Sequence, residues 1–385
     1  MAEPSPQPFL DPGGPSLVLG GAPSLLGAVE PLAVRGDTLF GPRGAALGPL
    51  VDGTRALAVC DTGHHRVLLW RQLPARDQAP AELVIGQPGF LSEGRNGRRP
   101  AGPASVNVPT GVALERDLLV VADAWNHRVL IWHGLPAESN APADVVLGQA
   151  DFTGVEANRG RAEAAADTLN WCYGVAVLDG RLVVADTGNR RVLVWNAVPR
   201  ASGRPADLVL GQPDFTHRDQ GAGQDAGPLG LRWPHAAAFD GRLYVADAGD
   251  NRVLGWSSWP TRSGQRPDFV IGQRDFGVVE HNRGRYWPDA GSVNMPYGVA
   301  AGGQWLLVAD TANSRLLGWR PAAAAADGPA SGLAGQLTFH DKGDNRWQPP
   351  VRDSLCWPYG VAVRDGLAVV ADSGNNRVLL WSLVA

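Results

Sequence analysis

The sequence predicts an all-β protein made of six copies of one small antiparallel sheet. The first observation behind this prediction is a segment that reads Val-x-Asp, then a short polar turn, then Arg-x-x-x-Trp, and that recurs six times in 385 residues. Its aspartates stand 61 to 63 residues apart, and such a fixed period indicates one repeated structural unit. The second observation is the strand pattern inside each unit. The six aspartates are Asp61, Asp123, Asp186, Asp247, Asp310 and Asp372.

The third unit, residues 169–215, shows this strand pattern. An apolar run at residues 174–178 is followed by an Asp-Gly turn and a second run at residues 182–185. After an Asp-Thr-Gly-Asn turn comes a third strand at residues 191–195, and a Pro-rich connection leads to a fourth at residues 208–212. Four short antiparallel strands joined by turns are typical of one blade of a β-propeller.

The outermost strand carries a second signature, Gly-Gln-x-x-Phe, which occurs five times rather than six. The missing copy is predicted at the N-terminus, where residues 16–20 match the outermost strand of the third unit, and residues 41–47 match an innermost strand. We therefore predict one domain, residues 1–385, with six four-stranded blades. Residues 16–21 complete the last blade and residues 1–15 form an irregular tail. A ring closed in this way leaves no open sheet edge.

Composition narrows the partners and the compartment. A formal net charge of −4 and a pI of about 6.1 give no reason to expect a nucleic acid as partner. The first residues lack the basic and apolar regions of a signal peptide, and no apolar run is long enough to span a membrane. Three cysteines make no disulfide framework. We expect a cytoplasmic monomer with reduced thiols and no membrane contact.

Parts of the repeat resemble a known family. The run Asn-Met-Pro-Tyr-Gly-Val-Ala from Asn294, followed by Leu-Val-Ala-Asp-Thr-Ala-Asn-Ser-Arg up to Arg315, resembles the NHL repeat, and so do the runs from Val106 and Val370. The resemblance extends over all six blades, and the Gly-Gln-x-Asp-Phe strand looks like a bacterial branch of the family. It implies a six-bladed propeller that binds proteins or RNA, or an enzyme such as the peptide-amidating lyase. More distant six-bladed propellers include metal-dependent lactonases and strictosidine synthase-like proteins.

The repeated aspartates and arginines are interpreted as structural rather than catalytic. Each aspartate ends a second strand and each arginine begins a third, so a carboxylate and a guanidinium can hold the turn between them. The glutamines of the Gly-Gln strands are predicted to bond between neighbouring blades. Side chains that differ at matching positions are therefore the candidates for function.

Chain direction assigns the loops to two faces. The turn between the second and third strands shares a face with the connection to the next blade, and these connections are long enough to suggest function. Their charges cancel over the five loops, so RNA binding is not favoured. The connections are residues 91–105, 153–167, 216–230, 277–291 and 340–354. Seven of the eight histidines belong to this long-loop face or to its centre: His64, His65, His127, His217, His235, His281 and His340.

One residue per blade, just before the apolar run of the innermost strand, is predicted to lie near the axis. Tyr, His and Arg together there would suit a pocket for a small polar or anionic ligand, or for a peptide. In that pocket Arg43 would anchor an anion and His235 would donate or accept a hydrogen bond. The alternative is that these side chains pack on one another and plug the channel. The predicted binding residues are Arg43, Thr110, Tyr173, His235, Tyr297 and Tyr359, with Trp171, Trp233 and Trp357 from two positions earlier.

Two other functions remain open from the sequence. A lyase or metal-assisted hydrolase would use the same pocket, with His235, Tyr297 and Cys172 for acid–base work. His235, Cys172 and Cys356 are weak candidates for metal ligands, since no CxxC, HxH or HExxH motif occurs. A scaffold for protein interaction would use the loop rim, where Trp259 and Trp347 are predicted to be exposed.

Overall fold

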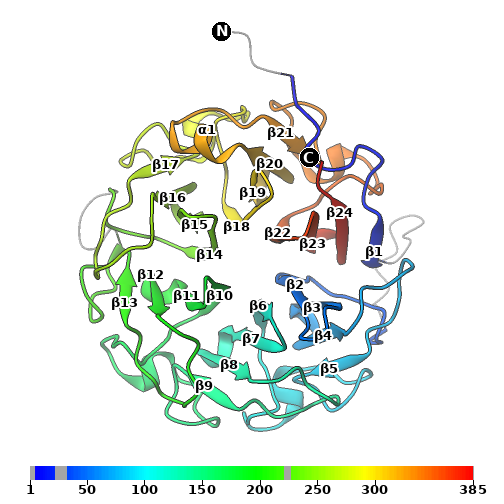
Figure 1. Cartoon of the computed structure of the whole chain (residues 1–385), viewed down its shortest axis with the longest axis vertical. Coiled ribbons are helices and arrows are strands. Elements are labelled where there is room, and N and C mark those ends of the chain that lie inside the picture. The colour runs from blue at the N-terminus through cyan, green and yellow to red at the C-terminus, as the bar shows by residue number, and fades with distance from the viewer. Residues whose placement is uncertain (1–4, 22–32, 221–226, 385) are drawn as a thin grey trace.

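The computed structural model describes residues 5–21, 33–220 and 227–384. The predicted tail is therefore described only from residue 5, and the third long connection without residues 221–226. In the described residues, six four-stranded antiparallel sheets stand as blades around a central axis, as predicted (Figure 1). Each blade is entered at its innermost strand, and the chain moves outward strand by strand. No helix of the described residues is long and apolar enough to cross a membrane.

Three strand positions recur in every blade, from the first to the sixth. The innermost strands are β2 (Ala45–Pro49), β6 (Pro109–Glu115), β10 (Cys172–Leu178), β14 (Pro234–Phe239), β18 (Pro296–Gly302) and β22 (Pro358–Arg364). The second strands are β3 (Arg55–Asp61), β7 (Leu118–Asp123), β11 (Arg181–Asp186), β15 (Leu243–Asp247), β19 (Trp305–Asp310) and β23 (Leu367–Asp372). The third strands are β4 (Arg66–Trp70), β8 (Arg128–Trp132), β12 (Arg191–Trp195), β16 (Arg252–Trp256), β20 (Arg315–Trp319) and β24 (Arg377–Ser382).

The outermost strands and the short helices complete the blades. The outermost strands are β5 (Leu83–Ile85), β9 (Val145–Leu147), β13 (Leu208–Leu210), β17 (Phe269–Ile271), β21 (Gly332–Ala334) and, in the sixth blade, β1 (Leu17–Gly20). One short α-helix, α1 (Pro321–Ala325), follows β20. A 3-10 turn follows each second strand: Thr62–His64, Ala124–Asn126, Thr187–Asn189, Ala248–Asp250, Thr311–Asn313 and Ser373–Asn375. Within the described residues, four long connections contain another: Arg95–Arg98, Ala157–Gly160, His281–Gly284 and Asp344–Trp347.

The second and third strands are apolar along nearly their whole length because both faces of each blade are covered. In β12 all five residues are buried, as expected for a strand that lies between two neighbouring sheets. Each hydrophobic cluster joins two adjacent blades, as where Leu57 of β3 and Val378 of β24 belong to one cluster. The core of the described residues is thus a ring of interfaces between blades.

The N-terminal segment closes the ring, which confirms the predicted closure. Strand β1 pairs antiparallel with β24, and Leu19 lies opposite Val378. A second link lies next to it, where Trp381 Nε1 donates to the carbonyl of Asp11 at 2.8 Å. In the first blade the matching indole of Trp70 donates to a carbonyl nine residues further along the same chain. Residues 5–15 contain only isolated bridges, yet Phe9 is fully buried and packs on Trp305 of the fifth blade.

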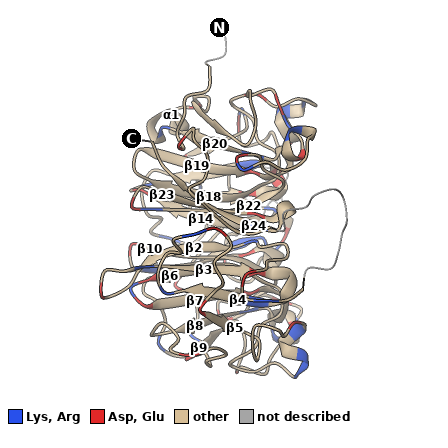
Figure 2. Ribbon diagram, turned by 90° about the vertical axis from the view of Figure 1, so that its right-hand side faces the viewer, with Lys and Arg blue, Asp and Glu red and all other residues tan. Residues whose placement is uncertain are grey.

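Hydrogen bonds confirm that the second-to-third-strand turns and the long connections share a face. Asn126 of a turn donates to Asn96 Oδ1 of the connection before it at 2.7 Å. The glutamines of the Gly-Gln strands also lie on this face, but the prediction that they bond between neighbouring blades was wrong. Gln149 Nε2 donates to the carbonyls of His127 in its own blade and of Glu156 in the connection that follows. Acidic and basic residues are interspersed when the molecule is seen from the side (Figure 2).

Candidate ligand site at the propeller axis

The repeated aspartate–arginine pairs are occupied by structural bonds. In the second blade, Asp123 accepts hydrogen bonds from the backbone N–H of Asn107 at 2.6 Å and from Arg128 Nε at 2.7 Å. The remaining donors of Arg128 bond to carbonyls of the two adjoining connections, including that of Phe152. Both side chains are fully buried. Each guanidinium nitrogen and each carboxylate oxygen of this pair thus has a protein partner, and neither side chain reaches solvent.

Five of the six predicted axial residues contact one another in a closed circuit. The ring of His235 lies 5.1 Å from that of Tyr173 and 4.3 Å from that of Tyr297. Tyr297 and Tyr359 are stacked, with 4.5 Å between ring centroids. The Arg43 guanidinium completes the circuit at 4.8 Å from the ring of Tyr359 and 5.8 Å from that of Tyr173. We call these five side chains the axial layer.

Thr110 occupies the sixth axial position without joining the layer. Its hydroxyl donates to the backbone carbonyl of Tyr173 at 2.8 Å, so it links the second blade to the third. The innermost strands are close enough here for such a bond, because a Cβ on Gly111 would lie only 2.7 Å from the same carbonyl. Thr110 therefore contributes to the packing of the blades rather than to the ring contacts.

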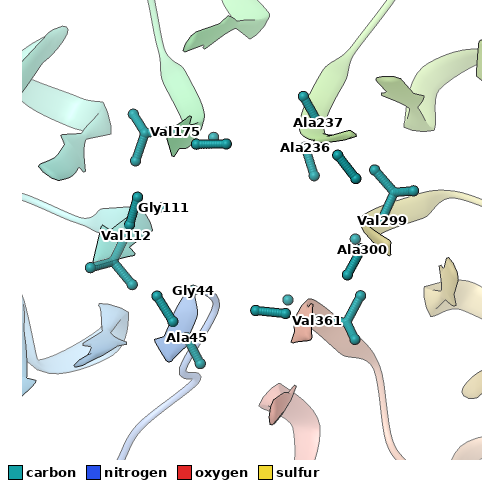
Figure 3. Close-up of a pocket in the computed structure, with 18 of the residues that line it drawn as sticks. Gly44, Ala45, Gly111, Val112, Val175, Ala236, Ala237, Val299, Ala300 and Val361 are labelled. Atoms are coloured by element: carbon teal, nitrogen blue, oxygen red, sulfur yellow. The ribbon is translucent and has the colours of Figure 1, made fainter. Parts of the chain in front are cut away.

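The axial layer separates two cavities, and its five side chains line both. On one side is a channel of about 210 Å³ between the innermost strands. Small residues such as Ala45, Val112 and Val175 line it (Figure 3). Arg364 and Glu115, at the ends of β22 and β6, form an ion pair that joins two strands of its wall. On the other side is a cavity of about 330 Å³ on the long-loop face, which we call the outer cavity. The layer thus packs on itself, as the plug alternative predicts, and also forms the floor of a pocket.

Among the described residues, the charged side chains that line the outer cavity are all positive. They are Arg43 and Arg190, and no aspartate or glutamate of the part of the chain that the structure describes lines this cavity. Among the described residues, no carboxylate lies within ion-pair distance of the Arg43 guanidinium. A guanidinium keeps its charge at any pH at which the protein is folded. The outer cavity therefore presents a permanent cation to whatever enters it.

His235 is neutral at physiological pH. Burial lowers its pKa to about 4, and the nearby charge of Arg43 contributes in the same direction. Its Nδ1 donates to the backbone carbonyl of Trp233 at 2.8 Å, which leaves Nε2 as an acceptor in the neutral ring. Burial also raises the pKa of Tyr297, next to the Tyr359 ring, so its hydroxyl stays protonated. The layer combines a cation with neutral hydrogen-bonding groups.

The three predicted tryptophans do not share one environment. Trp171 and Trp233 line the outer cavity and are about half exposed, whereas Trp357 does not line it. Trp171 has a left-handed backbone with φ of 47°, and so does the β-branched Val108, with φ of 54°. Such a conformation costs free energy in a non-glycine residue and requires support from its surroundings. The Trp171 N–H is held by His127 Nδ1 of the preceding blade at 2.9 Å.

Sequence reasoning missed Arg190 and Asn170, which also line the outer cavity. Arg190 stands at the end of the 3-10 turn in the third blade, where the chain is left-handed. Aligning the six repeats could have revealed Arg190, because it is the one residue at its repeat position whose side chain cannot accept a hydrogen bond. The six residues at this position are His65, His127, Arg190, Asn251, Ser314 and Asn376.

The cysteine candidates are not brought to the axial layer. Cys172 is buried beside the third strand of the second blade, where its thiol contacts the carbonyl of Arg128, and it lines neither cavity. Burial raises the pKa of Cys172 well above the ordinary value and that of Cys356 to about 12, so both are thiols at neutral pH. Within the described residues, no three His, Cys, Asp or Glu side chains form a group that could hold a metal ion.

Of the two rim tryptophans predicted to be exposed, one is placed as expected. Trp347 is 68% exposed on the long-loop face. The prediction for Trp259 was wrong, because this residue follows the third strand of its blade and packs on Phe239, with 4.6 Å between ring centroids. Arg181 covers its other side at 4.7 Å. Trp259 is therefore only partly exposed, away from the long connections.

Comparison with known protein families finds a match in two segments of the chain. The sequence pattern of the NHL repeat matches residues 107–132 and 355–379, in the second and sixth blades. These two segments are similar to NHL repeats. With the six-bladed ring, the match supports membership of the NHL propeller family. The bacterial branch stays a prediction. No curated protein matches the chain.

Several solved structures are similar to the chain at low identity. The WD40 β-propeller domain of Doa1 is 11% identical, with a TM-score of 0.49 over 96% of each chain. The structure of U3-55K is 14% identical, with a TM-score of 0.47 over 91% of this chain and 83% of that one. The hydrazine synthase of Kuenenia stuttgartiensis is 12% identical, with a TM-score of 0.46 over 92% of this chain and 99% of that one.

Proposed function

We propose that this NHL-type propeller is a binding module that holds a small anionic ligand in the outer cavity, with Arg43 as its anchor. The observation that carries the proposal is the Arg43 guanidinium, which stacks on two tyrosines but makes no ion pair with any described residue. Stacking holds the flat faces of the group and leaves its N–H edge free to bond. A carboxylate or phosphate matches that edge with two parallel hydrogen bonds.

The neighbours of Arg43 fit the same ligand. His235 is neutral, so it adds no charge of its own, and its Nε2 can accept a hydrogen bond from a hydroxyl or amide of the ligand. Trp171 and Trp233 supply apolar wall to the outer cavity. Its volume of about 330 Å³ is in the range of pockets for small organic molecules.

The test is a titration of the full-length protein with sodium butyrate and sodium sulfate at constant ionic strength, followed by NMR chemical shifts. Arg43→Met removes the cation but keeps the length of the side chain, and we expect it to weaken binding by about tenfold or more. Arg98→Asn removes an exposed arginine of the first long connection and should leave binding unchanged. The proposal fails if neither anion binds the wild type, or if Arg43→Met binds both as well as the wild type does.

A second candidate is protein interaction at the rim of the long-loop face. Tyr286, Trp287 and Trp347 are 65, 53 and 68% exposed, and aromatic residues of this kind are enriched at protein interfaces. Pull-down with a Tyr286→Ser/Trp287→Ser variant, compared with Arg43→Met, separates the two functions. Loss of partners only with the rim variant would favour the scaffold over the pocket.

A further inference from the structure

One hydrogen bond that links neighbouring blades is missing at the junction of the third and fourth blades. In the other five blades, the residue that ends the 3-10 turn accepts a hydrogen bond from a backbone N–H of the following blade. Asn251 Oδ1, for example, accepts from Met295 at 2.8 Å. Arg190 has no acceptor to offer. The N–H of Trp233 bonds instead to Asp247 Oδ1 at 3.1 Å, which it shares with Arg232.

This substitution puts a second guanidinium into the outer cavity. Arg190 lines that cavity together with Arg43. Its Nη1 donates to the carbonyl of Arg218 at 2.9 Å, and its Nε is buried with no hydrogen-bond partner among the described residues. No carboxylate of the described residues lies within ion-pair distance of it.

We infer that the ligand of the outer cavity carries two anionic groups and belongs to the class of small dicarboxylates. This inference rests on the proposed function, because Arg43 binds the first carboxylate. The second carboxylate bonds to Arg190, whose guanidinium forms no ion pair with any residue that the structure describes. Trp171 and Trp233 line the same cavity and contact the carbon chain between the two groups. Two cations held near each other are stabilised most by a ligand that neutralises both.

The inference predicts a preference that depends on one residue. Butyrate and succinate have the same number of carbons, as do pentanoate and glutarate, so each pair differs by one carboxylate. At constant ionic strength, we expect the wild-type protein to bind the dicarboxylate of each pair about tenfold more tightly than the monocarboxylate. Arg190→Asn should abolish this preference and still bind the monocarboxylates. Asparagine occupies the same left-handed position in two other blades, as Asn251 and Asn376, so the turn is expected to form.

Two variants make the outcome decisive. Arg43→Met should weaken both ligands of each pair, because it removes the anchor that they share. Arg98→Asn removes the same charge from the same face outside the cavity, and it should keep the preference of the wild type. If mono- and dicarboxylates bind the wild type equally, or if Arg98→Asn lowers the preference as much as Arg190→Asn, the inference is wrong while the proposed function stands. If no carboxylate binds the wild type, both are wrong.

Discussion

Arg128 Nε lies 2.7 Å from Asp123 Oδ2, and neither side chain is exposed to solvent. The two residues are direct partners in the ladder between β7 and β8. The same pairing occurs in the other five blades, as at Asp186 with Arg191. A buried carboxylate or guanidinium is costly unless its partner and its hydrogen bonds are all in place. The pair therefore specifies the register of the turn, and its geometry holds only when both members are present.

Loss of one member of this pair is expected to destabilise the protein strongly. Asp123→Asn leaves the Arg128 guanidinium buried without a counter-charge, which should lower the free energy of unfolding by about 3–5 kcal/mol. Urea unfolding at neutral pH measures the change. Asp37→Asn serves as control, since Asp37 pairs with Arg35 at the surface, where the Arg35 side chain is 58% exposed. That variant should change stability by less than about 1 kcal/mol. Equal effects of the two variants would contradict a structural role for the buried pair.

The fourth blade carries an aspartate where four other blades carry an asparagine. Asn126 Nδ2 donates to Asp123 Oδ2 at 2.7 Å, whereas Asp250 faces Asp247 of its own blade as a second carboxylate. Burial raises the pKa of Asp250 to about 6, and the charge of Asp247 adds to the rise, against Arg252 and Arg232. The folded state thus favours the protonated acid, so stability is lost as pH rises from about 4 through 6.

Asp250→Asn should therefore stabilise the protein in a pH-dependent way. We expect the free energy of unfolding to increase by about 1–3 kcal/mol near pH 8, where the wild-type carboxyl is ionised, and by less near pH 4.5. Urea unfolding of the two proteins at both pH values gives the difference, with Asp37→Asn reporting the effect of losing one surface charge. A gain that is the same at both pH values would show that Asp250 is not the titrating group.

Much of the fold could be predicted because its determinants are local in sequence. A turn aspartate and its arginine are five residues apart, and the strands are short apolar runs between turn residues. The repeat then aligned the axial positions, which is why Tyr173 and Tyr297 were correctly expected near the axis.

Contacts between blades could not be predicted in the same way. The hydroxyl of Thr110 donates to a carbonyl of the next blade, and no sequence pattern within the second blade predicts this hydrogen bond. Trp259 was misplaced because its partners, Phe239 and Arg181, come from two different blades. Aligning the repeats shows that Arg190 differs from the residues at its position in the other blades. The consequence could not be predicted, because it involves the backbone N–H of Trp233, whose partner only the structure gives.

The N-terminal strand should be part of the cooperative core. Leu19 is 1% exposed and belongs to the cluster between the sixth and first blades, so Leu19→Ala should lower the free energy of unfolding by about 2–5 kcal/mol. Leu91→Ala removes the same atoms from a side chain that is 80% exposed and should have an effect within about 0.5 kcal/mol. If Leu19→Ala were as mild as the control, β1 would not be holding the ring closed in solution.

The protonation of His235 gives a direct test of the axial layer. Because burial and Arg43 hold its pKa at about 4, we expect its imidazole to stay neutral at pH 5.5, where an ordinary histidine is mostly protonated. The neutral form is favoured in the folded state, so His235 contributes stability above about pH 6.5 that is lost as pH falls towards 4. An NMR titration of the ring carbons measures the midpoint and shows whether Nδ1 carries the proton.

Two comparisons assign the shift to its causes. His217 is exposed, and its hydrogen bond to Asp214 raises its pKa, so in the same spectra it should titrate above the ordinary range. Arg43→Met should raise the midpoint of His235, since it removes a nearby positive charge, and should leave that of His217 unchanged. Sulfate, which stays ionised over this range, should also raise the His235 midpoint if it binds at the axial layer. A His235 midpoint near 6.5 in the wild type would mean that the layer is open to water rather than packed.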